Sequence, residues 1–326
     1  MRRLRTVLAM LVALVPCLLK ADEEERIYHK VSLRNGNFFL NMQDCVVPRP
    51  HFPDRPFILE RSYNSQTADS FSFGVGWGSS LFHTLKILGD NTLKVRMFGG
   101  GTVYHFKPPF MDTDVQRSHV EENAKEISSL WDKSLGFASE SEMTMFTEDM
   151  LGNEYSVRDE QWGTLIDQGL VSHPVYPPGT RFQIEGEMVD GKPSYIYSIT
   201  VMDEGYVLRD HGVGYKCYFD LNGRLTATYY GTGPYYEYYL YDDNGYIRGV
   251  RDSEGMELDF MTDDQGKITE VHLNGEPVVR YKYEAGVLIE SIDSDGRLVR
   301  YAYDDYDNLT HIEFVTEGKE MTMRYA

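Results

Sequence analysis

The sequence is poor in basic residues and in cysteine, and each shortage argues against a class of function. Basic residues number 32 against 51 acidic ones, which gives a formal net charge of −19. Four of the basic residues and no acidic residue lie in the first 21 positions, so the rest of the chain has 28 against 51, or −23. A surface of this charge repels phosphate backbones and anionic lipid, so we expect no nucleic-acid binding. Beyond position 21 only Cys45 and Cys217 remain, and without close histidines they make no zinc site.

Long apolar runs are also missing, apart from one near the N-terminus. Three arginines precede thirteen apolar residues, 7–19. This run is too short to span a bilayer but suits the core of a secretory signal. We therefore predict a signal peptide over residues 1–21 and a mature protein that is secreted, periplasmic or at the cell surface, with no transmembrane span. The alternatives are a buried N-terminal helix, an uncleaved anchor or a lipoprotein acylated at Cys17, which the preceding Pro16 disfavours.

Export raises a question about the two remaining cysteines. A compartment outside the cytosol permits a disulfide between Cys45 and Cys217. Free cysteines also behave as small buried hydrophobic residues, and nothing in the sequence favours one role over the other. Both alternatives therefore stay open at this point.

Motifs of enzyme active sites are not found. The nine histidines are scattered, and no H-E-x-x-H segment occurs. The glycines of 74–78 have neither dinucleotide-binding spacing nor the form of a nucleophile elbow. We predict no enzymatic activity, no cofactor and no metal site. Adjacent carboxylates recur at repeat turns, where we interpret aspartate as a turn residue and not as a calcium ligand or acid–base pair: Asp242/Asp243, Asp263/Asp264 and Asp304/Asp305.

The chain before the tyrosine-rich region divides into three expected parts. Residues 22–110 alternate short strand-like segments with Pro and Gly, which predicts an N-terminal β domain. Residues 111–142 lack Gly and Pro before Gly136, and their apolar residues recur at steps of three and four, which predicts one inserted helix. The pattern of residues 143–194 again predicts strands and loops, which would form a connector.

The C-terminal part, 195–326, repeats itself and holds 19 of the 24 tyrosines. The segment Phe219–Leu225 recurs at Tyr241–Ile247 and, more diverged, three further times. Two turns per repeat of about 21 residues predict two strands per repeat, and so a curled antiparallel ribbon in which each copy packs on its neighbours. The expected fold class is all-β. The two turn series stand at positions 223, 245, 266, 286 and 307, and at positions 233, 255, 275, 296 and 318.

The Tyr-Asp-x-x-Gly-x-Leu/Ile repeat resembles the YD repeat of the RHS (rearrangement hotspot) family, which includes bacterial polymorphic toxins and wall-associated proteins. Arg61–Ser65 and Phe73–Trp77, with Gly36-Asn37, Asp44 and Pro56, resemble the entry segment before the repeats of that family. The resemblance covers roughly residues 30–106 and 195–326. It implies strands that spiral into a hollow shell, which in toxin members encloses a toxin domain released by self-cleavage.

This chain departs from the family pattern in length and in its C-terminal part. It has about five repeats, too few to close a shell, and we expect neither the Asp-Pro self-cleavage segment nor a following toxin domain. We therefore expect an open segment of such a shell. Whether the chain is a working short form or a truncated remnant stays open.

These observations predict an exported, non-enzymatic scaffold or binding protein whose ligand is a carbohydrate or a partner protein. The alternative is a shell component of a polymorphic toxin or secretion system whose toxic domain is encoded separately. A last strand near 321–325 would offer an unpaired sheet edge to a partner. Arg61, Tyr63, Asn64 and Trp77 are expected to be structural anchors. The ligand candidates are aromatic residues that a strand sends to both faces, and their simpler role is a cross-strand ladder: Tyr235, Tyr236, Tyr238 and Tyr239.

Overall fold

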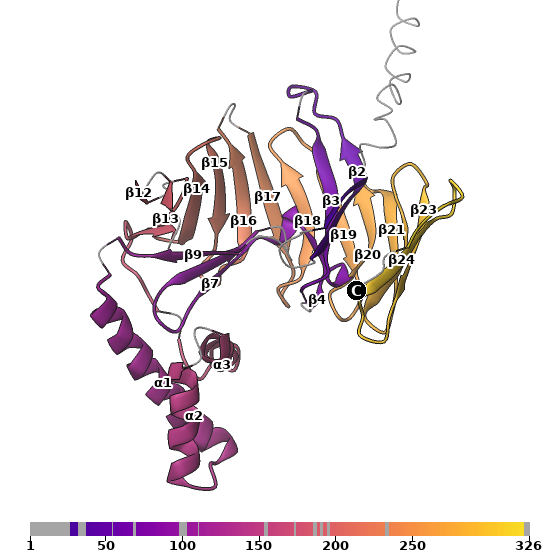
Figure 1. Ribbon diagram of the computed structural model, residues 1–326. Coiled ribbons are helices and arrows are strands. Elements are labelled where there is room, and N and C mark those ends of the chain that lie inside the picture. Colours follow the sequence, from indigo (N-terminus) through magenta and orange to yellow (C-terminus); the bar gives the residue numbers. More distant parts are fainter. Residues whose placement is uncertain are drawn as a thin grey trace, which may run out of the picture.

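The structure, a computed structural model, is built mainly of antiparallel β-strands (Figure 1). It describes residues 27–31, 37–53, 55–67, 70–97, 103–109, 111–152, 156–172, 174–184, 188–189, 192–193, 196–231 and 235–322. The predicted signal peptide, residues 1–21, lies outside the described residues. No helix in these ranges is both long enough and apolar enough to cross a membrane.

One long sheet forms the body of the molecule, and we call it the main sheet. Its strands pair in the order β7-β8-β9-β10-β13 and then consecutively to β25, with every neighbouring pair antiparallel. Their bounds are β7 (Thr84–Ile87), β8 (Leu93–Arg96), β9 (Val103–Lys107), β10 (Arg181–Ile184), β13 (Tyr197–Met202), β14 (Gly205–Asp210), β15 (Tyr215–Phe219), β16 (Leu225–Tyr230), β17 (Tyr235–Tyr241), β18 (Ile247–Asp252), β19 (Glu257–Thr262), β20 (Ile268–Leu273), β21 (Glu276–Glu284), β22 (Val287–Ile292), β23 (Leu298–Tyr303), β24 (Leu309–Phe314) and β25 (Lys319–Thr322).

The main sheet curls until its first strand touches it again. An isolated bridge joins Thr84 to Arg224, and the Leu85 N–H donates to the Gly223 carbonyl at 3.0 Å. Gly223 has φ +77, and a Cβ there would lie 1.8 Å from the Leu85 carbonyl oxygen, so only glycine fits. At the other end, no described residue pairs with the outer edge of β25. The sheet is therefore curled but open, as the sequence predicted.

The predicted turns coincide with turns of positive φ. All five positions of the first series have φ between 62 and 90, and Asp307 adopts this conformation in place of glycine. In the second series position 233 lies outside the described residues, and the other four glycines have positive φ. Before these turns an aspartate Oδ1 accepts hydrogen bonds from the N–H groups two and four residues later, at Asp220, Asp242, Asp263 and Asp304.

A tyrosine at the start of three of these turns, directly before Asp242, Glu284 and Asp304, ties its turn to the preceding repeat. The Tyr241 hydroxyl donates to the Leu225 carbonyl, and Tyr283 donates to Ile268, each at 2.8 Å. Tyr303 donates to the Leu288 carbonyl, also at 2.8 Å. These hydroxyls satisfy carbonyls at strand starts fifteen or sixteen residues earlier. At these three turns the tyrosine therefore has a structural role.

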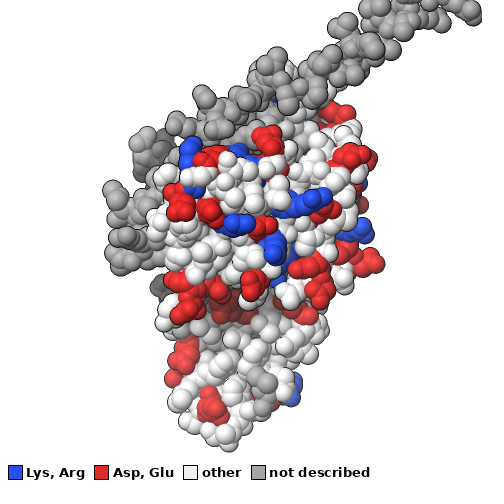
Figure 2. Space-filling model, turned by 90° about the vertical axis from the view of Figure 1, so that its right-hand side faces the viewer, with Lys and Arg blue, Asp and Glu red and all other residues white. Residues whose placement is uncertain are grey.

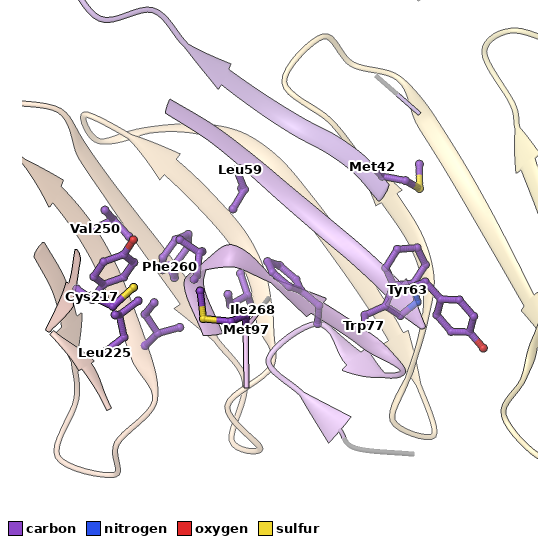
Figure 3. Close-up of a cluster of buried hydrophobic side chains, with 14 of the residues drawn as sticks. Met42, Leu59, Tyr63, Trp77, Met97, Cys217, Leu225, Val250, Phe260 and Ile268 are labelled. Atoms are coloured by element: carbon purple, nitrogen blue, oxygen red, sulfur yellow. The ribbon is translucent and has the colours of Figure 1, made fainter. Parts of the chain in front are cut away.

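The N-terminal strands lie across one face of the main sheet, which we call the inner face (Figure 1). Side chains from both layers form one core, with Leu59 and Trp77 on one side and Phe260 and Ile268 on the other (Figure 3). The strands of this layer are β1 (Ile27–Val31), β2 (Phe38–Val47), β3 (Phe57–Asn64) and β6 (Trp77–Ser79), and the short 3-10 helix η2 (Ser80–Phe82) follows β6. Two small hairpins are formed by β4 (Ser70–Phe71) with β5 (Gly74–Val75) and by β11 (Met188–Val189) with β12 (Lys192–Pro193).

The helical insertion is larger than the sequence predicted. One helix was expected at 111–142, but the structure has α1 (Thr113–Leu135), α2 (Glu140–Gly152) and α3 (Ser156–Asp167). The prediction of strands and loops for 143–194 was therefore wrong over its first half. The three helices share a small core of their own, formed by Ala124, Ile127, Met150, Trp162 and Leu165. Neither α2 nor α3 has a strongly segregated apolar face, which is why the sequence pattern missed them.

Cys45 and Cys217 are both buried and form no disulfide. Burial raises the pKa of the Cys217 thiol to about 12, so this side chain stays protonated at neutral pH. The structure therefore favours the second of the two roles, that of small buried side chains.

Candidate functional site

Two arginines from the N-terminal segment are held against the inner face by aromatic rings and carboxylates. The first is Arg61, which is fully buried. Its Nη2 donates to Asp44 at 2.8 Å and its Nε to the other oxygen of the same carboxylate. The guanidinium carbon lies 4.8 Å from the ring centroid of Trp77, 5.0 Å from that of Tyr281 and 5.6 Å from that of Tyr301. A buried cation needs such compensation, because unpaired burial of a charge is very costly.

The second is Arg49, in the loop between β2 and β3. Its guanidinium carbon lies 3.9 Å from the Tyr235 ring centroid, and its Nη2 forms an ion pair with Glu237. The Arg49 Nε lies 3.9 Å from Asp252, whose carboxylate accepts a 2.7 Å hydrogen bond from the Tyr235 hydroxyl. The second oxygen of Glu237 accepts hydrogen bonds from the hydroxyls of Thr228 and Tyr239, each at 3.0 Å. Every charge in this cluster is therefore engaged within the chain.

A cleft of about 520 Å³ opens beside Arg49, and we call it the inner cleft. It lies between the segments 49–60 and 80–83 of the N-terminal region and the strands β15 to β17 of the main sheet. Its volume lies in the range of small-molecule sites. Aromatic rings form much of its wall, and its lining residues are Arg49, Phe52, Arg55, Pro56, Phe57, Ile58, Glu60, Ser80, Leu81, His83, Val213, Tyr215, Tyr230, Gly231, Tyr235, Glu237 and Tyr239.

Burial controls the ionisation of the groups in the inner cleft. Burial lowers the pKa of His83 to about 4, so its imidazole is neutral at pH 7. The pKa of Glu60 is raised, first by burial and then by the charge of Asp44. Burial also raises the pKa of Tyr215, Tyr230 and Tyr239, which keeps the three phenols protonated.

The opposite face of the main sheet, the outer face, carries a second group of tyrosines. The rings of Tyr236 and Tyr238 are stacked, with an interplanar angle of 11° and centroids 5.9 Å apart. The ring centroid of Tyr229, on the paired strand β16, lies 4.8 Å from that of Tyr236. The Lys216 ammonium lies 4.8 Å from the Tyr229 ring centroid. We call Lys216, Tyr218, Tyr229, Tyr236 and Tyr238 the outer tyrosine patch. Tyr238 keeps 45% of its surface exposed.

The outer face changes character toward the C-terminus, where charges of both signs alternate across strands. Glu290 lies opposite Arg300, which in turn lies opposite Glu313. Arg280 pairs with Glu270 in the same way. Figure 2 shows this end of the molecule with acidic and basic side chains intermingled. Because these charges satisfy one another, the aromatic part of the outer face around β15 to β17 is the more distinctive surface.

The four tyrosines predicted as ligand candidates divide between the two faces. Tyr235 and Tyr239 are buried and line the inner cleft, whereas Tyr236 and Tyr238 belong to the outer tyrosine patch. Arg61, Tyr63 and Trp77 are buried anchors, as their expected structural role requires. Sequence patterns did not point to Arg49, Glu60 or His83, because the inner cleft joins segments more than 120 residues apart.

The described part of the chain contains no group of three or more His, Cys, Asp or Glu side chains able to hold a metal ion. The adjacent aspartates lie at repeat turns, and the first of each pair accepts backbone hydrogen bonds there. These contacts agree with their interpretation as turn residues.

Comparison with known proteins gives a partial match. A protein-family model described as "Domain of unknown function (DUF6531)" matches residues 28–106, less than half of the chain. No curated protein matches. Among solved structures, one titled "Crystal Structure of TcdB2-TccC3-TEV" matches with 9% identity over 85% of this chain and a TM-score of 0.17. The match spans only 18% of that chain, and at this TM-score it carries no argument.

Proposed function

We propose that this protein is an exported, non-enzymatic binding scaffold of the YD-repeat type, and that its outer tyrosine patch binds carbohydrate. Export rests on the composition of residues 1–21, and the family assignment rests on the repeat motif together with the entry segment. The inner face is largely occupied by the chain's own N-terminal strands. A ligand that approaches the sheet from outside therefore meets the outer face first.

The observation that carries the proposal is the pair of stacked rings at Tyr236 and Tyr238 on that face. Sugars present apolar C–H faces that pack on aromatic rings, and their hydroxyls accept hydrogen bonds from amines and phenols. Lys216 lies beside Tyr229 and supplies such a donor. The rings are held in place because Tyr235 and Tyr239, which alternate with them, are fixed on the inner face. Such preorganisation lowers the entropic cost of binding.

The test is a glycan array probed with the mature chain, residues 22–326. We expect retention on a defined class of glycans, and at least about a tenfold loss of affinity for Tyr236→Ala or Tyr238→Ala. Tyr306→Ala is the matched control, because Tyr306 is 87% exposed in a turn outside the patch. A chain that retains no glycan, or that binds equally well without both rings, would contradict carbohydrate binding.

A shell component of a toxin or secretion system is the second candidate, and the outer edge of β25 favours it. No described residue pairs with this edge, so strands of a separate chain would continue the sheet there. Lys319 and Glu320 are exposed on β25, and such charges disfavour pairing between identical copies. Size-exclusion chromatography with light scattering tests this idea. A monomer that forms a stable complex with the product of an adjacent gene would support it, and a closed homo-oligomer would oppose it.

A further inference from the structure

The main sheet already binds two organic cations, and both belong to its own chain. Arg61 and Arg49 each place a guanidinium against aromatic rings, and each pairs with a carboxylate. Aromatic rings attract cations through the negative potential of their faces, and a carboxylate adds a full charge. The inner face of this sheet thus repeatedly uses the same recognition chemistry.

The inner cleft contains the components of a third such site. Tyr215, Tyr230, Tyr239 and Phe52 contribute aromatic surface to its wall, and Glu60 contributes a carboxylate. Glu237, the other carboxylate of the cleft, is engaged by Arg49, Thr228 and Tyr239.

Glu60 differs from Glu237 because no group in the described part of the chain compensates its charge. Within the ranges that the structure describes, no side chain or backbone group donates a hydrogen bond to its carboxylate or forms an ion pair with it. Burial is the first cause of its raised pKa, and no cation contributes to that pKa. A half-buried carboxylate in this condition is stabilised by a cationic partner.

We propose that the inner cleft binds an organic cation, with an ammonium group held between Glu60 and the aromatic wall. This proposal deepens the proposed binding function and rests on it, but concerns the opposite face of the sheet from the outer tyrosine patch. Arg49 takes no part in recognising an anion, since Glu237 and Asp252 already neutralise it. A metal ion is a poor occupant, because a single free carboxylate among aromatic rings offers too few oxygen ligands. The neutral His83 adds no opposing charge.

Besides Arg49, whose charge is neutralised, Arg55 is the cation that the described lining of the cleft sets against a bound ammonium group. Its side chain is exposed, so water and salt screen it more than they screen the half-buried Glu60. The overall formal charge of −19 further favours the approach of a cation. The cleft, at about 520 Å³, has room for a quaternary ammonium compound or for the end of a lysine side chain.

The experiment measures binding to the mature chain by isothermal titration calorimetry with choline and with 3,3-dimethyl-1-butanol. The second compound has the shape of choline but a carbon atom in place of the charged nitrogen, so the pair isolates the charge. We expect choline to bind at least tenfold more tightly than its neutral counterpart. Nα-acetyl-L-lysine amide forms a third arm, and tighter binding of this probe than of choline would identify a protein side chain as the natural ligand.

The decisive variant is Glu60→Gln, which keeps the shape of the side chain and removes its charge. We expect at least a tenfold loss of affinity for whichever cation binds. The control is Glu204→Gln, because Glu204 is an exposed acidic residue in the turn between β13 and β14 and does not line the cleft. Thermal unfolding of both variants verifies that they are folded, and relief of a half-buried charge predicts that Glu60→Gln is at least as stable as the parent.

Three results would overturn the proposal. They are no binding of either cation, equal binding of choline and 3,3-dimethyl-1-butanol, and unchanged affinity in Glu60→Gln. If these occur while the outer tyrosine patch still binds glycan, the inner cleft fails as a site and the proposed function stands. Loss of both activities would reject the binding function as a whole.

Discussion

Arg61 and Asp44 form a two-point ion pair that is sealed from solvent, with the Arg61 side chain fully buried and Asp44 2% exposed. The pair joins strands β2 and β3, and the hydroxyls of Tyr281 and Tyr301 extend it to the main sheet. Tyr281 donates to Asp44 at 2.7 Å, and Arg61 donates to Tyr301 at 3.0 Å. The network therefore fastens the N-terminal strands to repeats more than 230 residues later in the sequence.

Breaking this network from one side is expected to be costly. Asp44→Asn leaves Arg61 buried without its counter-charge, so we expect a loss of about 3–5 kcal/mol in the free energy of unfolding. Urea denaturation, monitored by circular dichroism, measures this loss in the free energy of unfolding. Glu290→Gln is the matched control, because it breaks an ion pair with the half-exposed Arg300 and is expected to cost about 1 kcal/mol or less. Similar losses for the two variants would show that Asp44 does not anchor the N-terminal strands.

The buried His83 makes stability depend on pH in a defined window. Its folded-state pKa is lowered from 6.5 to about 4, so between these values the unfolded chain binds a proton that the folded chain excludes. The stabilising contribution is present above pH 6.5 and is lost as the pH falls toward 4, by up to about 3 kcal/mol.

Urea unfolding at pH 7.0 and pH 4.5 tests this dependence. Since other groups also titrate over this range, the informative quantity is the difference between the parent chain and His83→Gln. We expect the variant to lose less stability on acidification than the parent. An unchanged loss in the variant would show that His83 is protonated without penalty in the folded protein.

The helical insertion is expected to be dispensable for the fold. Strands β9 and β10, which flank it, are antiparallel neighbours in which Lys107 lies opposite Gln183. Few polar contacts tie the helices to the sheet. Gln116 donates to Asp90 at 3.0 Å, and the Gly89 N–H donates to Asp159 at 3.3 Å.

Deletion of residues 111–172 should therefore leave a folded main sheet joined by a short loop. We expect a loss of helical signal in far-ultraviolet circular dichroism, a retained cooperative transition and a cost of about 1–3 kcal/mol from the uncovered Asp90. A truncated chain that no longer unfolds cooperatively would show that the helices stabilise the sheet.

The sequence was informative where structure is local and periodic. The two series of turns predicted the strand pairs of the C-terminal part, because Asn-Gly and Asp-Gly steps specify turn conformation directly. The alternation of Tyr235 and Tyr236 correctly placed them on opposite faces. The roles of Arg61 and Trp77 as anchors were also foreseen, although their partners at Tyr281 and Tyr303 were not.

The sequence was uninformative where structure depends on distant segments. In the inner cleft Glu60 lies near the strands that contain Tyr215 and Tyr230, and no local sequence pattern predicts this proximity. Helices α2 and α3 escaped prediction because they bury few residues, among them Met150 and Trp162, in a small core shared by all three helices. Both the inner cleft and the helices α2 and α3 therefore depend on tertiary packing and not on local sequence patterns.

The contacts of the N-terminal strands with late repeats also have a consequence for folding. Arg61 and Tyr301, which hydrogen-bond in the folded protein, are 240 residues apart. Contacts of such sequence separation slow folding, since a long loop must close before they form. During synthesis the strands β2 and β3 are made long before Tyr281 and Tyr301, so their network with these residues forms only after the late repeats have been made. Arg61 can therefore be buried against its aromatic partners only in a chain whose final repeats have been made and paired.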